Sequence, residues 1–402
     1  MRIIGGIDIG NGYVKGLIEN EKTHKETVVD IPSSVAYVTN IHDIKTEGKD
    51  IPYVIDNIFN EADISFDTPL IKDQNRRLFG ERGVLSGMSL EEFDIYSHIS
   101  KANQDLSGVL LLGSIACKAL QDYYDEKKML PVDIITVKAR IAIALPIREY
   151  IRHRVDYANR LKSDTHMVTF YNFERLIRFN IVLQDVQVLA EGASAQFAII
   201  QKANELGEGF LTALLDDVRK VDPSFDPAIT AEDIKAATSV AGIDIGEGTV
   251  NFPVFMGGKF NSDASFTLDK GYGSVMAKAL DRLTDDGHAF KTRKDLETFL
   301  LKKPSAMQRT MHETVSHVVE EETVAFVKEI TAQFKKLIVR IGSMLEVVYV
   351  YGGGATAIKD ALHPALVKVK HESNAGYPIM YLDSRYSRKL NREGLMYIAK
   401  RY

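Results

Sequence analysis

Short apolar runs separated by polar turns open the chain, and their spacing is typical of β-strands. The runs lie at Ile3–Ile9, Tyr13–Glu19 and Thr27–Ile31, with Gly, Asn and Lys in the turns between them. Runs of this length bounded by turn residues predict an antiparallel β-meander. Further along, a strand is predicted at Ala139–Leu145 and a helix at Arg148–Leu161, where apolar residues recur at helical spacing.

The centre of the chain mixes the two periodicities. Two strand-like runs, Leu176–Leu183 and Val186–Leu189, precede a predicted helix at Glu191–Lys202 that is small and apolar on one face. Two polar stretches of weak periodicity, residues 41–74 and 203–233, predict loops or insertions rather than domain boundaries.

The remainder again alternates strands and helices. The predicted elements are a strand at Val240–Ile245, a helix opening near Gly273, a helical stretch from about Met307 to Leu345, a strand at Val347–Tyr351 and a helix around Arg388–Lys400.

An internal repeat links the beginning of the chain to its second half. The pattern Gly-Ile-Asp-Ile-Gly-x-Gly occurs at residues 6–12 and again at residues 242–248, a separation of 236 residues. Each copy is followed by another run of β-prone residues. Such a repeat predicts two similar halves.

Composition and charge exclude several classes of protein. The chain has 402 residues, which at about 150 residues per domain predicts two to three domains. Its 45% hydrophobic and 26% charged residues exclude a disordered, collagen-like or coiled-coil chain. The formal net charge of −5 disfavours non-specific electrostatic binding of the chain to nucleic acid or to an anionic membrane. We therefore expect neither direct DNA binding nor membrane binding.

The single cysteine, Cys117, excludes a disulfide within the chain, and the periodic apolar stretch around it predicts a buried, unreactive thiol. The N-terminus runs into a strand without the apolar core of a signal peptide, and nowhere do about 18 apolar residues run together. The expected compartment is the cytoplasm.

The two repeated turns carry the residues of greatest chemical interest. Glycines permit positive φ and let backbone N–H groups converge on an oxyanion, so each turn is a candidate phosphate cradle. Asp8 and Asp244 precede the turns and are candidates for holding a hydrated Mg²⁺, which needs only one or two carboxylates. Lys15, seven residues after Asp8, is a candidate phosphate contact. The alternative is two tight turns with Asp caps and a solvated lysine.

A third glycine-rich segment, Gly352-Gly353-Gly354, follows the predicted strand at Val347–Tyr351. A strand, a glycine turn and a helix in this order let a flat base or ribose approach the backbone closely. The alternative is a flexible loop between strand and helix.

Together, these pieces resemble the ATPase core of the actin superfamily. The order is Asp8-x-Gly10-Asn11-Gly12 with Lys15, then Glu191, then Asp244-x-Gly246-x-Gly248-Thr249, then the glycine triplet. Within the superfamily the chain most resembles the ParM-type, or StbA-type, bacterial proteins that segregate plasmids. Segments 145–150 and 391–395 are similar to segments of that family.

The resemblance implies an α/β fold with a duplicated actin/ribonuclease H-like core, in which two domains flank a nucleotide cleft. It implies a first domain of residues 1–190 and 375–402, and a second domain of residues 191–374. The first domain would hold the first turn and the C-terminal helix, and the second would hold the second turn and the glycine triplet.

The resemblance also implies roles for single residues. Glu191 begins the helix that connects the halves and orients or activates the attacking water, Asp244 takes part in catalysis and in water-mediated Mg²⁺ binding, and Glu247 is a second candidate acid or metal-water ligand. Asn11 stands where many relatives have Ser or Thr. The implied nucleotide-binding residues are Gly10, Asn11, Gly12, Lys15, Gly246, Gly248, Thr249, Gly352, Gly353 and Gly354.

The implied ligands are ATP or GTP with Mg²⁺. The implied partners are further copies of the chain in a head-to-tail filament, and a ParR-like DNA-binding adaptor at a centromere-like site. The alternative is a sugar or acid kinase on the same core, which needs a catalytic Asp beside a substrate hydroxyl. No clear motif for such an Asp lies between Asp30 and Tyr171.

Overall fold

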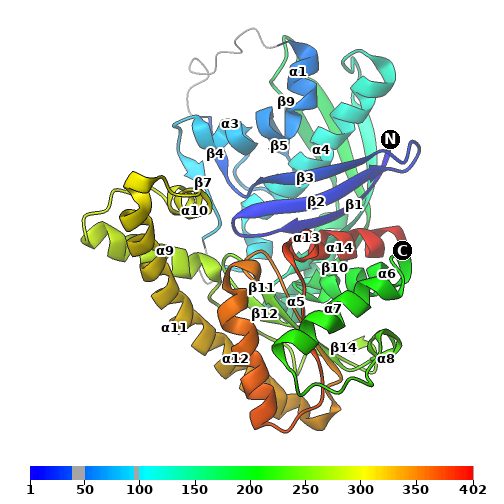
Figure 1. Ribbon diagram of the computed structural model, residues 1–402. Coiled ribbons are helices and arrows are strands. Elements are labelled where there is room, and N and C mark those ends of the chain that lie inside the picture. Colours follow the sequence, from blue (N-terminus) through cyan, green and yellow to red (C-terminus); the bar gives the residue numbers. More distant parts are fainter. Residues whose placement is uncertain (39–49, 95–98, 402) are drawn as a thin grey trace. The chain divides into compact units, whose positions relative to one another are not determined.

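The chain forms two compact units in the computed structural model, which describes residues 1–38, 50–94 and 99–401 (Figure 1). The first unit comprises Met1–Ala198 and Lys389–Tyr402, and the second comprises Ile199–Arg388. Each unit is built around its own β-sheet. The two halves predicted from the repeat therefore correspond to separate units.

The boundaries of the units correct the expected ones. Residues 375–402 were expected to return together to the first domain, but strand β17 (Ile379–Tyr381) pairs in parallel with β16 (Val347–Tyr351) of the second sheet. The chain therefore returns to the first unit only at Lys389, and the first crossing falls after Ala198 rather than after residue 190.

The first sheet begins with the predicted meander. Strands β1 (Arg2–Ile9), β2 (Tyr13–Asn20) and β3 (Glu26–Pro32) pair antiparallel in sequence order, which confirms the prediction. The centre is parallel, with β1 beside β8 (Ile135–Leu145) and β8 beside β10 (Ile177–Ala190). The other strands of this sheet are β4 (Val35–Tyr37), β5 (Asp63–Asp67), β6 (Arg77–Leu78), β7 (Leu90–Glu91) and β9 (Thr165–Phe170).

Strand β10 replaces the two strands predicted at Leu176–Leu183 and Val186–Leu189. Its pairing with β8 continues throughout, with a shift of register between Leu183 and Asp185. Such a shift is an irregularity of the β-bulge type, which bends a strand without ending it. The polar residues at this position therefore mark a bend inside one strand.

Helices cover both faces of this sheet. Successive residues of β1 point to opposite faces, so they pack in two different layers. Ile3 and Ile7 join the core formed with helix α4 (Asp105–Lys127), whereas Ile4 joins a second cluster formed with α14 (Leu390–Arg401). The remaining helical elements of the first unit are α1 (Ile51–Asp56), α2 (Ile58–Glu61), α3 (Gly80–Leu85), η2 (Lys101–Asn103) and α5 (Ile147–Lys162).

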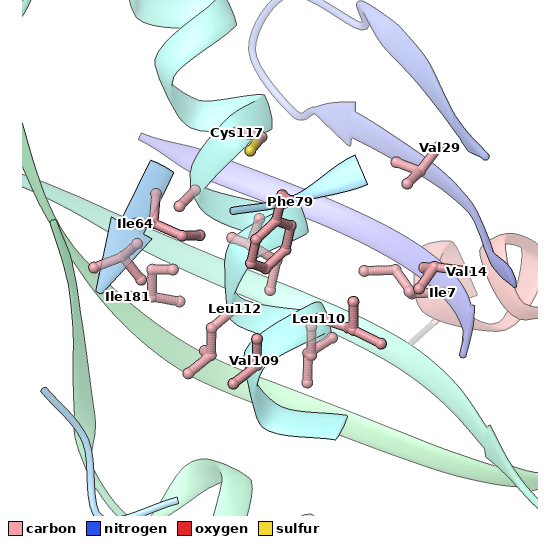
Figure 2. Close-up of a cluster of buried hydrophobic side chains, with 14 of the residues drawn as sticks. Ile7, Val14, Val29, Ile64, Phe79, Val109, Leu110, Leu112, Cys117 and Ile181 are labelled. Carbon is pink, nitrogen blue, oxygen red and sulfur yellow. The ribbon is translucent and has the colours of Figure 1, made fainter. Parts of the chain in front are cut away.

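Helix α4 is the centre of the first core. Figure 2 shows Val109, Leu110, Leu112 and Cys117 of this helix among apolar side chains of the surrounding strands. Cys117 is fully buried, as predicted, and burial raises the pKa of its thiol well above the usual range. A thiol in such surroundings is inert, because the reactive form is the thiolate.

Two segments predicted as loops or insertions contain regular structure. Within residues 41–74, helices α1 and α2 and strand β5 form, while residues 41–49 lie outside the described part of the chain. Within residues 203–233, helix α7 (Glu208–Val221) forms, and α8 (Ala231–Ala236) begins there at a capping box between Thr230 and Asp233. The short lengths of most of these elements explain the weak periodicity.

The second unit has a seven-stranded sheet centred on β11 (Val240–Ile245). Apolar residues on one face of β11 pack with α9 (Tyr272–Asp285), α11 (Arg309–Ile341) and α12 (Lys359–Glu372) in a second core. Helix α6 (Ala193–Glu205) spans the boundary between the units. The remaining elements are β12 (Val250–Phe252), β13 (Val254–Met256), β14 (Lys259–Phe260), β15 (Phe266–Leu268), α10 (Arg293–Leu301), η3 (Ala306–Gln308), η4 (Gly342–Met344), η5 (Thr356–Ile358) and α13 (Ser384–Ser387).

Helix α14 lies unusually close to its neighbours in the first unit. A Cβ atom on Gly6 of β1 would overlap the backbone of Met396, and a Cβ on Gly394 would overlap the backbone carbonyl of Ser194. Both glycines are therefore required by the close approach of backbones. The helix at 390–401 is an integral layer of the first unit.

Candidate functional site

The first repeated turn is a tight hairpin between β1 and β2. The amide of Gly10 donates a hydrogen bond of 2.9 Å to the carbonyl of Tyr13, and the carbonyl of Gly12 accepts one of 2.9 Å from the amide of Ser33. The hydroxyl of Ser33 is buried and has no hydrogen-bond partner among the residues that the structure describes. A buried hydroxyl beside a glycine turn is a polar group available to an anion.

Asp8 and Lys15 lie opposite each other at the base of this hairpin. They are cross-strand partners in the register of β1 and β2. Burial and the negative charge of Glu191 raise the pKa of Asp8 to about 6, against the opposing effects of Lys101 and Lys15. The first unit thus brings two carboxylates and two lysines together from three separate parts of the sequence: the hairpin, Lys101 and Glu191.

Glu191 occupies a turn rather than the start of a helix. It follows β10 directly, its amide donates to the carbonyl of Leu145 at 2.7 Å, and Gly192 after it has a φ of +79°. Helix α6 begins only at Ala193. Glu191 was expected to begin the connecting helix, but the helix begins two residues later. The left-handed backbone conformation of Gly192 is not helical, so the helix starts only after it.

Lys101 is a site residue that the sequence analysis missed. Its Nζ lies 3.1 Å from Oε1 of Glu191, and the residue is only 6% exposed. The ammonium also lies 5.4 Å from the centroid of the Phe93 ring. No sequence signal marks this lysine, because its partner is 90 residues away and no motif surrounds it.

The second repeated turn has the same hydrogen bond as the first. The amide of Gly246 donates to the carbonyl of Thr249 at 2.9 Å, between β11 and β12. Asn251, seven residues after Asp244, is the cross-strand partner of Asp244, just as Lys15 is that of Asp8. The internal repeat is therefore structural as well as sequential.

Asp244 is 5% exposed and lies beside the glycine triplet. Its register partner on the parallel side is Tyr351, the last residue of β16. Gly352 has a φ of +103°, and a Cβ at this position would lie 2.6 Å from Oδ1 of Asp244. The amide of Gly354 donates to the carbonyl of Ile245 at 2.8 Å. The second turn and the triplet, far apart in sequence, thus lie side by side within the second unit.

Glu247 of the second turn is tied to the start of helix α9. Its carboxylate Oε1 lies 3.0 Å from Nη1 of Arg293, and its carbonyl accepts a hydrogen bond of 2.9 Å from the amide of Gly273. The side chain is 45% exposed. These contacts fix the turn against the first residues of α9 and α10.

Asp8 is a carboxylate of the kind that holds a hydrated magnesium ion. Among the described residues, no group of three or more His, Cys, Asp or Glu side chains is arranged to hold a metal. Magnesium keeps several waters and is bound through one or two carboxylates. Asp8, whose charge is disfavoured by burial and by Glu191, is a carboxylate that a nearby cation stabilises.

Family models match both parts of the chain. Residues 6–193 match the actin like proteins N terminal domain, and residues 242–364 match archaeal actin homologue MreB-like, C-terminal. A comparison with curated proteins gave no significant match. Across the residues that the structure describes, no helix is both long and apolar enough to span a membrane.

Solved structures of actin-like proteins share the fold. The actin-like protein Alp7A superposes with a TM-score of 0.65 at 15% identity, covering 100% of this chain and 97% of that one. The 15-stranded ParM filament from Clostridium botulinum gives 0.61 at 17% identity, covering 100% and 99%. ParM of Bacillus thuringiensis with AMPPNP gives 0.60 at 16% identity, covering 99% and 98%. The α/β actin-like fold is thereby confirmed, and the two matched family models identify the chain as a member of the actin-like proteins.

Proposed function

We propose that the chain is a ParM-type, nucleotide-dependent filament protein that binds and hydrolyses ATP or GTP with Mg²⁺. The observation that carries this proposal is the structural repeat of the two turns. Each turn closes with the same glycine amide bond, at Gly10 and at Gly246, and each follows a strand that bears an aspartate. Turns with converging amides are suited to phosphate oxygens.

The two turns supply the phosphate contacts in this proposal. In the first unit these come from the backbones of Gly10, Asn11 and Gly12 and from the ammonium of Lys15. In the second unit they come from Gly246, Gly248 and Thr249. The triplet Gly352–Gly354 accommodates the nucleoside, because its lack of side chains lets a flat group approach the backbone.

Asp8 and Asp244 hold the metal through water, with Glu247 as a second acidic group near the second turn. When bound, Mg²⁺ supplies positive charge that neutralises the β- and γ-phosphates. Both aspartates lie at the ends of central strands of their sheets. Asp244 is paired on two sides, and Asp8 is paired with β2 and directly follows Ile7, which is paired on two sides. Their positions are therefore rigid.

Glu191 orients the attacking water. The water oxygen bonds to the γ-phosphorus as the bond from that phosphorus to the bridging oxygen breaks. The diphosphate leaves with the electron pair, one water proton remains on inorganic phosphate and the other is released to solvent. Such a reaction depends mainly on positioning and charge neutralisation.

The filament and its adaptor are proposed from family likeness. A ParM from Clostridium botulinum is described as a 15-stranded filament, and one from Bacillus thuringiensis was solved with AMPPNP. A head-to-tail contact that does not close generates an open filament. Since this chain has a net charge of −5, a ParR-like DNA-binding adaptor at a centromere-like plasmid site would join the filament to DNA.

Light scattering with ATP or GTP and Mg²⁺, recorded alongside phosphate release, tests the proposal. We expect scattering to rise after nucleotide addition and to decay as phosphate appears. Diphosphate release that depends on an added sugar or acid, without scattering, would instead identify a small-molecule kinase. In a gel-shift titration at physiological salt, nanomolar binding of plasmid DNA by the chain alone would remove the need for an adaptor.

A further inference from the structure

We propose that Lys101 is a positioning residue for nucleotide hydrolysis, whose ammonium holds the carboxylate of Glu191 in the orientation that the attacking water requires. The inference rests on the proposed hydrolytic function and adds a residue that neither turn contains. It is drawn from the contacts of Lys101 within the first unit.

The ammonium of Lys101 is in a confined, mostly dry environment. Nζ lies 3.1 Å from Oε1 of Glu191, and the two side chains are 7% and 13% exposed. The face of the Phe93 ring lies 5.4 Å from the ammonium, which adds a cation–π attraction. An ion pair with so little water around it is held more firmly than one at a surface, because solvent screens it less.

The backbone that carries Lys101 is itself fixed by helix α5. The carboxylate of Glu149 accepts hydrogen bonds from the amides of Lys101 at 2.9 Å and Ala102 at 3.3 Å. The guanidinium of Arg160 donates to the carbonyl of Ala102 at 2.6 Å. Two side chains of one long helix thus clamp the short η2 segment. A lysine on a clamped segment can define the position of its partner.

Glu191 needs such a partner because of where it lies. It occupies a turn between a strand and a helix, next to a glycine of positive φ, rather than a rigid element. A glutamate there has several rotamers of similar energy, and only some direct the carboxylate to a given point. Groups that act on a reacting water must be held within about 0.5 Å of the productive geometry.

Lys101 also offsets the repulsion between two negative charges. The charge of Glu191 and that of Asp8 repel, and the charge of Lys101 opposes this effect at Asp8. Removing the ammonium would therefore increase the repulsion that pushes Glu191 away from Asp8 and would remove one contact that orients its carboxylate. In the hydrolysis step, in which water adds to the γ-phosphorus and the diphosphate leaves, Lys101 forms and breaks no bond. Its effect reaches the reaction only through Glu191.

A purely structural ion pair is the competing explanation, and Lys118 provides the matched control. Lys118 is fully buried in α4, with its Nζ 2.6 Å from Oδ1 of Asp122. Lys118→Met and Lys101→Met each remove one buried ammonium from a lysine–carboxylate pair in the same unit. Both are expected to lower the melting temperature, but only Lys101→Met should change hydrolysis per folded molecule.

The experiment measures single-turnover hydrolysis of ATP and GTP, nucleotide affinity and thermal unfolding for the full chain. We expect Lys101→Met to slow hydrolysis at least tenfold while the nucleotide Kd stays within about threefold, and Lys101→Arg to recover most of the rate. Equal hydrolysis by Lys101→Met and wild type would overturn the inference while leaving the proposed function intact. Absence of hydrolysis by wild type would overturn both.

A double variant tests the route through Glu191 and removes both buried charges, so that it does not depend on the folding of Lys101→Met. We expect Lys101→Met combined with Glu191→Gln to hydrolyse nucleotide at the rate of Glu191→Gln alone. Losses that multiply, with the double variant at least tenfold slower than Glu191→Gln, would show that Lys101 acts independently of Glu191 and would refute the positioning role.

Discussion

Lys15 and Asn251 occupy the same position in the two repeated turns. Each is the seventh residue after the turn's aspartate and is its cross-strand partner, Lys15 opposite Asp8 and Asn251 opposite Asp244. In the second copy this position carries a neutral side chain that is hydrogen-bonded inside the unit: Oδ1 of Asn251 accepts a hydrogen bond of 2.7 Å from the hydroxyl of Thr267. The two turns therefore share a backbone but differ in charge, and the cation belongs to the first.

This difference predicts the effect of Lys15→Gln. Losing the positive charge beside the first turn should weaken nucleotide binding about tenfold or more, since charge-assisted contacts to phosphate are among the stronger polar interactions. The unfolding midpoint should change little, because Lys15 is partly exposed. Titration with a fluorescent nucleotide measures the affinity. An unchanged affinity would mean that Lys15 is a solvated surface lysine that does not contact the nucleotide.

Asp244→Ala should abolish phosphate release while the protein still unfolds cooperatively. Asp244 supplies a carboxylate in the proposed site, whereas its strand is held by pairing with β12, β13 and β16. The measurement is phosphate release together with a thermal melt. Asp244→Asn is the matched control for volume and should be equally inactive. Normal turnover by either variant would exclude Asp244 from catalysis.

Glu191→Ala should slow hydrolysis more than it weakens nucleotide binding, because its proposed contact is made chiefly in the transition state. In a light-scattering assay the variant should assemble and then persist. Disassembly at the wild-type rate would mean that Glu191 serves only as the partner of Lys101 in an ion pair.

Acid should weaken the second unit through Asp222. Although burial alone raises the pKa of this carboxyl, hydrogen bonds from Lys370, Ser224 and His371 and the charge of Lys370 lower it to about 2. A carboxyl with a lowered pKa contributes stability that is fully present above its unfolded pKa near 4 and is lost as pH falls towards 2.

The comparison with Asp222→Asn isolates this contribution. At pH 7 the variant should lose several kcal/mol, since Lys370 is left buried without its charged partner. Between pH 4 and pH 2 the difference in unfolding free energy between wild type and variant should shrink by about 2 kcal/mol. Urea unfolding at several pH values measures this. A difference independent of pH would contradict the assignment.

Gly394→Ala should lower the unfolding free energy by about 2 kcal/mol, because its new methyl group overlaps the carbonyl of Ser194 and forces α14 away from its neighbours. Gly209→Ala is the control. Gly209 lies in helix α7, and beyond its chain neighbours and the nearby backbone of its own helix no atom of the described residues lies within 4 Å of an added Cβ. The change should therefore be neutral or stabilise by up to about 1 kcal/mol. Thermal melts of both variants decide the matter.

The parts of the fold that the sequence predicted are those encoded locally. The meander and the turns at Gly10 and Gly246 depend on residues a few positions apart. Because the turn sequence occurs twice, each copy also strengthened the prediction of the other. The correspondence of Lys15 with Asp8 follows from the same local register.

The parts that were missed depend on contacts between distant residues. The role of Lys101 depends on Glu191, the return of the chain at Lys389 depends on the pairing of β17 with β16, and the continuity of β10 depends on β8. In each case a tertiary partner decides the outcome, and a single sequence does not reveal which segments become neighbours.

The packing of α14 against β1 affects the order in which the protein acquires its structure during synthesis. The second unit is one continuous stretch of the chain, so it can fold as soon as Ile199–Arg388 has left the ribosome. The first unit is begun earlier but must wait for its last layer, for roughly 10–40 s at about 5–20 residues per second. During that interval Ile4, Leu17 and Ala142 have no covering helix α14. The unit that starts first is thus completed last, and its uncovered sheet face is where chaperones should bind the nascent chain.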